Sequence, residues 1–105
     1  MSFRTPTAVT VLSQALDSAD LETRKRAANA LSFMGRQAAP AVPSLISTLT
    51  NSDSELRYCA TSALADIGPP ARAAIPALNR LTNDSSGMVQ RAAARAFTAI
   101  ETADR

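Results

Sequence analysis

The sequence contains no histidine and no tryptophan, and its 105 residues include a single cysteine. Without histidine, the chain lacks the residue that most often acts as a general base or binds a metal. The one cysteine, Cys59, cannot form an intramolecular disulfide, and with scattered carboxylates it cannot complete a closed zinc site. We therefore expect no catalytic residues, no metal, no cofactor and no enzyme activity.

Aromatic residues, glycine and long apolar stretches are also scarce. Aromatics make up 4% of the chain, too few for a convincing β-sheet. The three glycines stand at positions 35, 68 and 87, so the chain has neither a glycine-rich phosphate loop nor a nucleophile elbow. No stretch approaches the roughly 20 apolar residues of a membrane span, and no signal peptide follows Arg4. We expect a cytoplasmic protein without membrane contact, because its one cysteine suits a reducing compartment.

What the sequence does contain is a repeat, since it matches itself when it is shifted by 33 residues. The matching positions are Val9, Val42 and Ile75; Leu12, Leu45 and Leu78; Ala27, Ala60 and Ala93; and Met34, Ile67 and Ile100. Such a pattern predicts stacked units that bury their apolar faces against their neighbours. We expect one domain, residues 1–105, with repeats at about 6–37, 38–70 and 71–101.

Each unit has the pattern of two helices. In the second helix of the middle unit, apolar residues recur every three or four positions: Leu56, Cys59, Ala60, Ala63, Leu64 and Ile67. Asp53 or Ser54 stands at the N-cap position, and Gly68 at the end. Asp20 and Ser86 mark the corresponding helix starts in the other units, and Gly35 ends the one in the first. The first helices are shorter, with prolines near their starts: Pro6, Pro40, Pro43 and Pro76.

The middle unit also carries a recognisable family pattern. Its residues are Ala41, Val42, Pro43, Ser44 and Leu45, then Leu49, Asn51, Ser52 and Asp53, then Glu55, Leu56 and Arg57, and finally Ala63, Leu64, Ile67 and Gly68. They resemble a HEAT repeat, most closely the short type of phycobilisome-lyase-like proteins, over about residues 6–101. The resemblance implies an all-α fold, a short right-handed α-solenoid of three helix-turn-helix repeats with six helices. The third unit departs from the pattern at Gly87, Gln90 and Glu101, as a terminal repeat or a fragment of a longer array would.

Two side-chain types have both a structural and a functional interpretation. Cys59 lies on the apolar stripe, so we favour a packed small side chain over a reactive thiol. Arg24 and Arg57 each follow an aspartate, Asp20 or Asp53, by four residues. We favour structural pairing, either at this helical spacing or from one unit to the next, over a row of ligand-binding arginines.

The outer face of each second helix is the candidate binding surface. At about 100° per residue, the aligned positions are Lys25, Asn29, Ser32 and Arg36; Tyr58, Ser62 and Ala65; and Arg91, Arg95 and Thr98. In solenoids of this kind the second helices line the concave surface. We therefore expect a groove with Lys25, Asn29, Arg36, Tyr58, Ser62, Arg91 and Arg95 as its partner-binding residues, basic at both ends with the tyrosine between them. A solvated face without a partner is the alternative.

Three functions are compatible with these features. The first is a non-catalytic scaffold that binds a protein or acidic peptide segment in the groove. The second is binding of a nucleic-acid backbone through the same cations, for which the net charge of +2 is weak support. The third, a subunit or chaperone of a bilin-lyase-like enzyme, rests on the resemblance alone. Exposed apolar side chains at the end units, among them Phe3, Val11 and Phe97, make weak self-association an alternative to a monomer.

Overall fold

The computed structural model describes residues 5–102, and all regular structure in that range is helical. The expected all-α fold is confirmed, and no strand occurs among the described residues. The elements are α1 (Thr5–Ala15), α2 (Leu21–Met34), the 3₁₀ helix η1 (Gly35–Ala41), α3 (Val42–Thr48), α4 (Ser54–Ile67), the 3₁₀ helix η2 (Pro69–Ala74), α5 (Ile75–Leu81) and α6 (Gly87–Thr102).

The expectation of six separate helices needs a correction, because the described backbone forms five uninterrupted helical segments. The elements α2, η1 and α3 follow one another without an intervening non-helical stretch, although Gly35 ends the α-helix of α2, and η2 leads directly into α5. Pro40 lies inside η1, and not at the start of the next α-helix as we expected. Proline has a helical φ angle, and short 3₁₀ helices often connect α-helices. The links between units are therefore 3₁₀ helices.

Aspartate side chains begin two of the second helices, as expected. The carboxylate of Asp20 accepts a hydrogen bond from the backbone N–H of Thr23 at 3.0 Å, and that of Asp53 accepts one from Leu56 at 2.9 Å. Each carboxylate thereby satisfies one of the amide groups that a first helical turn leaves unpaired. Of the two candidates in the middle unit, Asp53 is the N-cap, and Ser54 is the first residue of α4.

Glycines end the same two helices. Gly35 has a φ of 59° and Gly68 a φ of 80°, a left-handed conformation that side-chain-bearing residues rarely adopt. The N–H of Gly68 donates to the carbonyl of Leu64 at 3.1 Å and closes the last turn of α4. The sequence therefore predicted both helix ends correctly.

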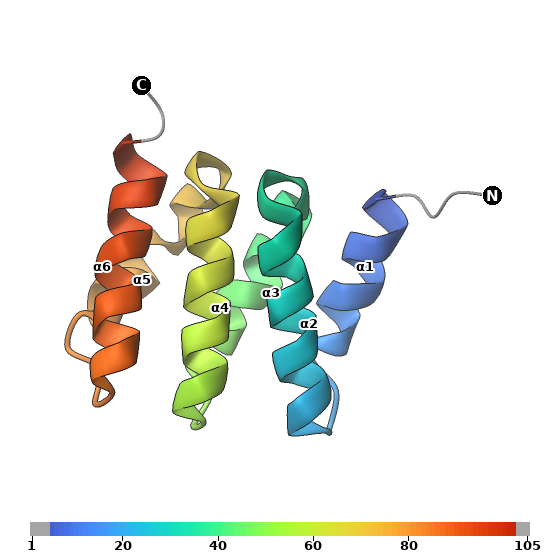
Figure 1. Ribbon diagram of the computed structural model, residues 1–105, viewed down its shortest axis with the longest axis horizontal. Coiled ribbons are helices and arrows are strands. Elements are labelled where there is room, and N and C mark those ends of the chain that lie inside the picture. Colours follow the sequence, from blue (N-terminus) through green and yellow to red (C-terminus); the bar gives the residue numbers. More distant parts are fainter. Residues whose placement is uncertain (1–4, 103–105) are drawn as a thin grey trace.

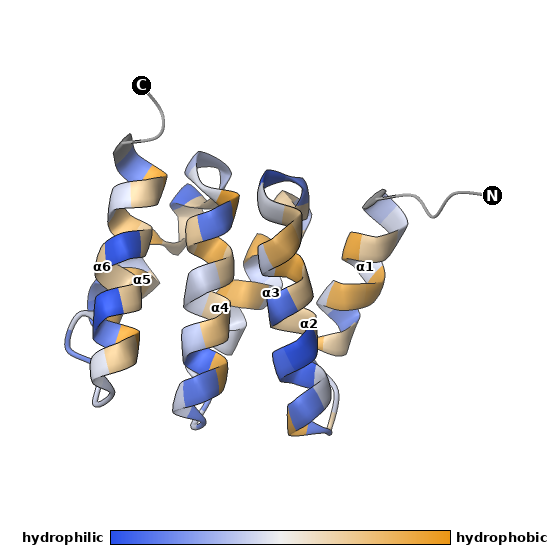
Figure 2. Cartoon of the chain, in the orientation of Figure 1, coloured by the Kyte–Doolittle hydropathy of each residue, from blue (hydrophilic) through white to orange (hydrophobic). Residues whose placement is uncertain are grey.

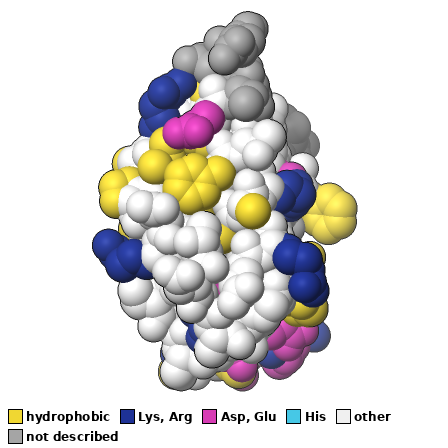
Figure 3. Space-filling view, turned by 90° about the vertical axis from the view of Figure 1, so that its left-hand side faces the viewer, with side chains coloured by type: hydrophobic (Ala, Val, Ile, Leu, Met, Phe, Trp, Pro, Cys, Tyr) yellow, Lys and Arg dark blue, Asp and Glu magenta, His cyan; other side chains and the backbone are white. Residues whose placement is uncertain are grey.

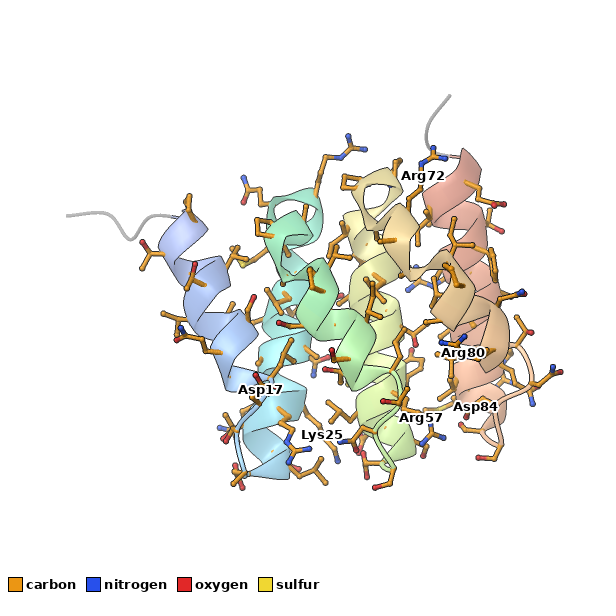
Figure 4. All side chains as sticks on the ribbon, turned by 180° about the vertical axis from the view of Figure 1, so that it is seen from behind. Asp17, Lys25, Arg57, Arg72, Arg80 and Asp84 are labelled. Atoms are coloured by element: carbon orange, nitrogen blue, oxygen red, sulfur yellow. The ribbon has the colours of Figure 1, made fainter. Side chains whose placement is uncertain are left out.

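The helices form two layers. Helices α2, α4 and α6 lie side by side in chain order (Figure 1), and α4 packs against both of the others. Helices α3 and α5 lie behind them and come to the front in the reverse view (Figure 4), where α1 continues their row. The Cα atoms span 44 × 36 × 17 Å, so the molecule is a slab about two helices thick. This order agrees with stacked hairpins.

The core lies between the layers and between neighbouring units. The buried residues are nearly all hydrophobic. Along α2, α4 and α6, hydrophilic segments alternate with hydrophobic ones (Figure 2). The repeated positions supply much of the core: Val9, Val42, Leu45, Leu78, Ala27, Ala60, Ala93, Ile67 and Ile100 are buried. Their counterparts Leu12, Met34 and Ile75 are partly buried and pack against it. The 33-residue match therefore predicted the positions of the core correctly.

The end units expose some apolar side chains, as expected. Val11 is 52% exposed, and Phe97 is partly buried against the core. Phe3, the third candidate, lies outside the described residues. Hydrophobic side chains gather near one end of the α6 side of the molecule, where most other atoms are polar side chains or backbone (Figure 3). Self-association through the end units stays a prediction.

The arginines at equivalent positions hold loops, and only one of them pairs with an aspartate. Arg57 binds Asp84, in the loop of the next unit, through Nε–Oδ1 at 3.0 Å and Nη2–Oδ2 at 2.8 Å. Its Nη1 also donates to the carbonyls of Asn51 and Ser52 at 2.9 and 3.1 Å. The local pairing with Asp53 is replaced, because the Asp53 carboxylate caps α4. Of the two structural alternatives, the contact between units is correct for Arg57.

Each unit uses the same position to hold its own loop. Arg24 donates to the carbonyl of Ser18 at 2.5 Å, Arg57 to that of Asn51, and Gln90 to that of Asp84 at 2.5 Å. The donor and the acceptor are six residues apart in all three units. Gln90, which departs from the family pattern, therefore makes the same hydrogen bond within its unit but lacks the positive charge of the arginines.

Leu64 tests this architecture, because its side chain is fully buried in α4, the central helix of the front layer. We expect Leu64→Ala to lower the free energy of unfolding by about 2–5 kcal/mol, through lost burial and the cavity left behind. Urea denaturation followed by circular dichroism measures the change. Phe33→Ala is the control, since Phe33 is 93% exposed and should change stability by less than about 0.5 kcal/mol. A loss below about 1 kcal/mol for Leu64→Ala would contradict the assigned core.

The ion pair between units predicts a pH dependence of stability. The hydrogen bond from Arg57 holds the pKa of the Asp84 carboxyl below its ordinary value of 3.8. The stabilisation is therefore complete above about pH 4 and is lost as the pH falls through the lowered value. We expect Asp84→Asn to cost about 2 kcal/mol at pH 7, and the gap to the wild type to narrow in acid. Urea unfolding at a series of pH values measures it, and a gap that is unchanged from pH 7 to about pH 3 would contradict the assignment.

Candidate functional site

A pocket between α4 and α6 unites three of the residues expected to bind a partner. The α4–α6 pocket is lined by Tyr58, Met88, Arg91, Ala92 and Arg95, and its volume is about 280 Å³. Tyr58 comes from the first turns of α4, and the other four residues come from α6. Met88, Arg91 and Arg95 lie three and four positions apart, so they share one side of α6. The helical register that places alanines in the core therefore presents these residues to solvent.

The α4–α6 pocket is lined by both positively charged and apolar side chains. Arg95 approaches Asp66 with Nη1–Oδ1 at 3.9 Å, and its side chain is 57% exposed. Within residues 5–102, the structure shows no ion pair for Arg91. Met88 and Tyr58 are 47% and 38% exposed. Two guanidinium groups beside an exposed tyrosine and methionine can bind a carboxylate together with an apolar side chain.

Lys25 is held by carboxylates of its own molecule. Its Nζ lies 2.7 Å from Glu55 Oε1, 3.8 Å from Asp53 and 3.9 Å from Glu22, and its side chain is 16% exposed. The hydrogen bond to Glu55 raises the pKa of Lys25. Lys25 therefore links α2 to α4, and the positive charge that we expected at this end of the surface is balanced by acids.

A second pocket lies between α2 and α4. The α2–α4 pocket is lined by Asn29, Ser32, Phe33 and Asp66 and has a volume of about 400 Å³. Ser32 donates a hydrogen bond to Asp66 across the two helices. Phe33 projects into solvent with 93% of its surface exposed. Of the residues that we expected to bind a partner, Asn29 alone lines this pocket. The lining of the pocket combines an amide, a hydroxyl, a carboxylate and an aromatic ring.

The remaining expected residues lie outside both pockets. Ser62 is half-buried on α4, one turn from both Tyr58 and Asp66, so it lies between the pockets. Arg36 is exposed but belongs to η1, because Gly35 ends α2 before it. The helical alignment that placed Arg36 with Lys25 and Asn29 does not continue past that glycine.

Three pocket residues were missed by the sequence reasoning. Asp66 follows Ser62 by four positions and continues the same face of α4, whereas the residue we aligned there, Ala65, is 5% exposed. Met88 precedes Ala92 by four positions on α6. Spacing could have revealed both of these residues. Phe33 carries no such signal, because an apolar residue beside a core stripe is expected to pack inward.

The thiol of Cys59 is buried, at 7% exposure, among the residues of the core. Burial raises the pKa of Cys59, and the nearby Glu55 carboxylate raises it further. A raised pKa disfavours the thiolate, which is the nucleophilic form. Our interpretation of Cys59 as a packed side chain is consistent with this environment.

Among residues 5–102, no group of three histidine, cysteine, aspartate or glutamate side chains is placed to hold a metal ion. None of the helices in this range combines the length and the apolar character needed to cross a bilayer.

Comparisons with known proteins give a family and a fold. The family model for HEAT repeats matches residues 42–104. Two engineered proteins, solved as crystal structures by the Northeast Structural Genomics Consortium, are similar over 88% of the chain, each with a TM-score of 0.76. Their sequence identities are 31% and 33%, and the chain spans 44% and 27% of their lengths. A search of curated proteins gives no significant match, and nothing here indicates the lyase-type subgroup. Because the HEAT-repeat model covers more than half of the sequence, the chain belongs to the HEAT-repeat family.

Proposed function

We propose that the protein is a non-catalytic interaction scaffold that binds an acidic segment of a partner protein on the outer face of α2, α4 and α6. HEAT repeats typically mediate protein interactions, which supports the class of function. The α4–α6 pocket carries the proposal, because it combines Arg91 and Arg95 with Tyr58. Arginine and tyrosine are the residue types that dominate binding energy at protein interfaces.

The proposal includes the arrangement of the repeats. We propose three hairpins at about 6–37, 38–70 and 71–101 that form a short right-handed solenoid, with the second helices lining its concave groove. The side-by-side order of α2, α4 and α6 supports it (Figure 1). In this arrangement the α4–α6 pocket holds an acidic and an apolar side chain of the segment, and Asn29 offers its amide further along. Lys25, Ser62 and Arg36 then contribute at the margins of the surface.

The distribution of charge favours a protein over a nucleic acid. Lys25 is surrounded by three carboxylates, and Asp66 lines the α2–α4 pocket and lies 3.9 Å from Arg95. A phosphate backbone laid along this surface would be repelled by these acids, whereas protein surfaces that bind nucleic acids are predominantly positive. The basic character is confined to the α6 side of the surface. One acidic segment fits such a restricted positive area better than a polyanion does.

A role as a subunit of a bilin-lyase-like enzyme rests on the resemblance alone. We propose a cytoplasmic location on the single cysteine and on the sequence composition. A monomer or a weakly self-associating protein fits the partly exposed apolar residues of the end units.

Affinity capture with a charge-matched control tests the proposed function. We expect the triple variant Tyr58→Ala, Arg91→Ala, Arg95→Ala to reduce capture of at least one protein from the source organism more than tenfold, because truncating such anchors costs roughly 2 kcal/mol or more. Quantitative mass spectrometry measures the difference. The purified partner should then show the same loss in a titration.

The control is Arg26→Ala with Arg80→Ala, which removes the same number of charges from exposed sites outside both pockets. This variant should capture the partner as the wild type does. Equal capture by the triple variant would remove this surface from consideration. A gel shift with DNA or RNA at low salt that the triple variant abolishes would favour the nucleic-acid alternative.

A further inference from the structure

The contact that Arg57 makes with the next unit has no acidic counterpart one repeat earlier. Asp84 corresponds to Asn51 when the sequence is shifted by 33 residues, and Arg57 corresponds to Arg24. Arg57 therefore binds a carboxylate, whereas Arg24 faces a loop whose equivalent residue is a neutral amide. Figure 4 shows Asp17, Arg57 and Asp84 along one edge of the molecule, where the loops of successive units meet.

The two loops are otherwise built alike. Asn51 accepts a hydrogen bond from the backbone N–H of Asp53 through Oδ1 at 2.9 Å, and Asp84 accepts one from Ser86 through Oδ2 at 2.9 Å. This hydrogen bond orients the side chain of Asn51 in the same way as that of Asp84. The remaining polar group of Asn51 is then the amide NH₂, a donor, where Asp84 presents an acceptor to its arginine. Two donors cannot satisfy each other.

The guanidinium of Arg24 is placed differently from that of Arg57. Arg57 reaches the carbonyl of its own loop with Nη1, which leaves Nε and Nη2 for Asp84. Arg24 reaches the equivalent carbonyl with Nε, and within residues 5–102 this is the hydrogen bond that its guanidinium makes. The Nη donors of Arg24 are consequently left for another acceptor.

A pocket lies at the place where that acceptor would sit. The loop-edge pocket has a volume of about 230 Å³ and is lined by Leu16, Asp17, Arg24, Ser47, Thr48, Asn51 and Leu56. It contains both members of the mismatched pair, Arg24 and Asn51. The pocket therefore occupies the space between the arginine and the loop that the Arg57–Asp84 ion pair fills in the next unit.

We propose that the loop-edge pocket binds a carboxylate group, which Arg24 and the amide of Asn51 hold in place of the missing aspartate. A planar guanidinium is well suited to grip a carboxylate with two hydrogen bonds. The next unit indicates the class of ligand, because its equivalent arginine, Arg57, binds the Asp84 carboxylate through Nε and Nη2. The loop-edge pocket also contains an acid, Asp17, so it lacks the net positive charge that a phosphate or sulfate dianion favours. This site is separate from the α4–α6 pocket.

Two variants test the site without removing the loop contacts. Asn51→Asp rebuilds the arrangement of Arg57 and Asp84, so it should fill the pocket from within the chain. Arg24→Gln copies the third unit, in which Gln90 keeps the hydrogen bond to the loop carbonyl. We expect both variants to fold and both to bind carboxylates at least tenfold more weakly than the wild type, the effect of losing a charge-assisted contact.

The measurement is an NMR titration of ¹⁵N-labelled protein. It follows the Arg24 Nε–H resonance in the wild type and in Asn51→Asp, and the backbone amides of the pocket residues Asp17 and Thr48 in all three proteins. Acetate should cause a saturable shift in the wild type, and sodium chloride and sulfate at equal ionic strength should not. A capped Gly-Asp-Gly peptide carries its only carboxylate on a side chain. If it binds more tightly than acetate, the carboxylate ligand comes from an acidic side chain of a partner protein. If it binds equally or more weakly, the ligand is a free carboxylate compound. A saturable shift that persists in Asn51→Asp, an equal response to sulfate, or no saturable shift would overturn the proposal.

Discussion

The structure depends on the burial of α4 between two neighbours. Nine of its 14 residues are buried, whereas α2 buries three of 14. A single hairpin of this kind cannot cover its own apolar stripe, so each unit is stable only when the next one packs against it. Alanines at the helix contacts, among them Ala60 and Ala93, allow the backbones to approach closely. The stability of the whole chain therefore rests on the middle unit.

This constraint separates the residues that hold the stack from those that are free to vary. On α4 the buried residues include Ala60, Ala63, Leu64 and Ile67. The outer side of the helix carries Tyr58 and Asp66, which lie about two turns apart. Substitutions on that side change the surface without opening a cavity. A repeat protein can therefore acquire a binding surface from residues that contribute little to its fold.

Local signals predicted the fold well, because most of its determinants lie within one helix or one repeat. The 33-residue match located core positions such as Leu45 and Leu78, and aspartate and glycine marked the ends of α2 and α4. The 3₁₀ links were missed, since proline near position 40 is compatible with both a helix start and a short tight helix.

The candidate site was predicted less completely, because it depends on contacts between repeats. Helical spacing brought Tyr58, Arg91 and Arg95 together correctly. It could not show that Lys25 is held by Glu55, 30 residues away, or that Arg57 prefers Asp84 to Asp53. Long side chains choose between several partners within reach, and that choice depends on the packing of two units.

Departures from the repeat are where this chain can differ from a regular array. In a regular array every interface would carry the same partly buried ion pair, and Arg57 with Asp84 shows that this chain can form it. Asn51 removes the acid at one interface, and Gln90 removes the cation from the last unit. Both residues keep their local loop hydrogen bonds, so the changes alter charge while the turns are preserved. The interaction between units can therefore be adjusted at single positions along this edge while the apolar core remains the same.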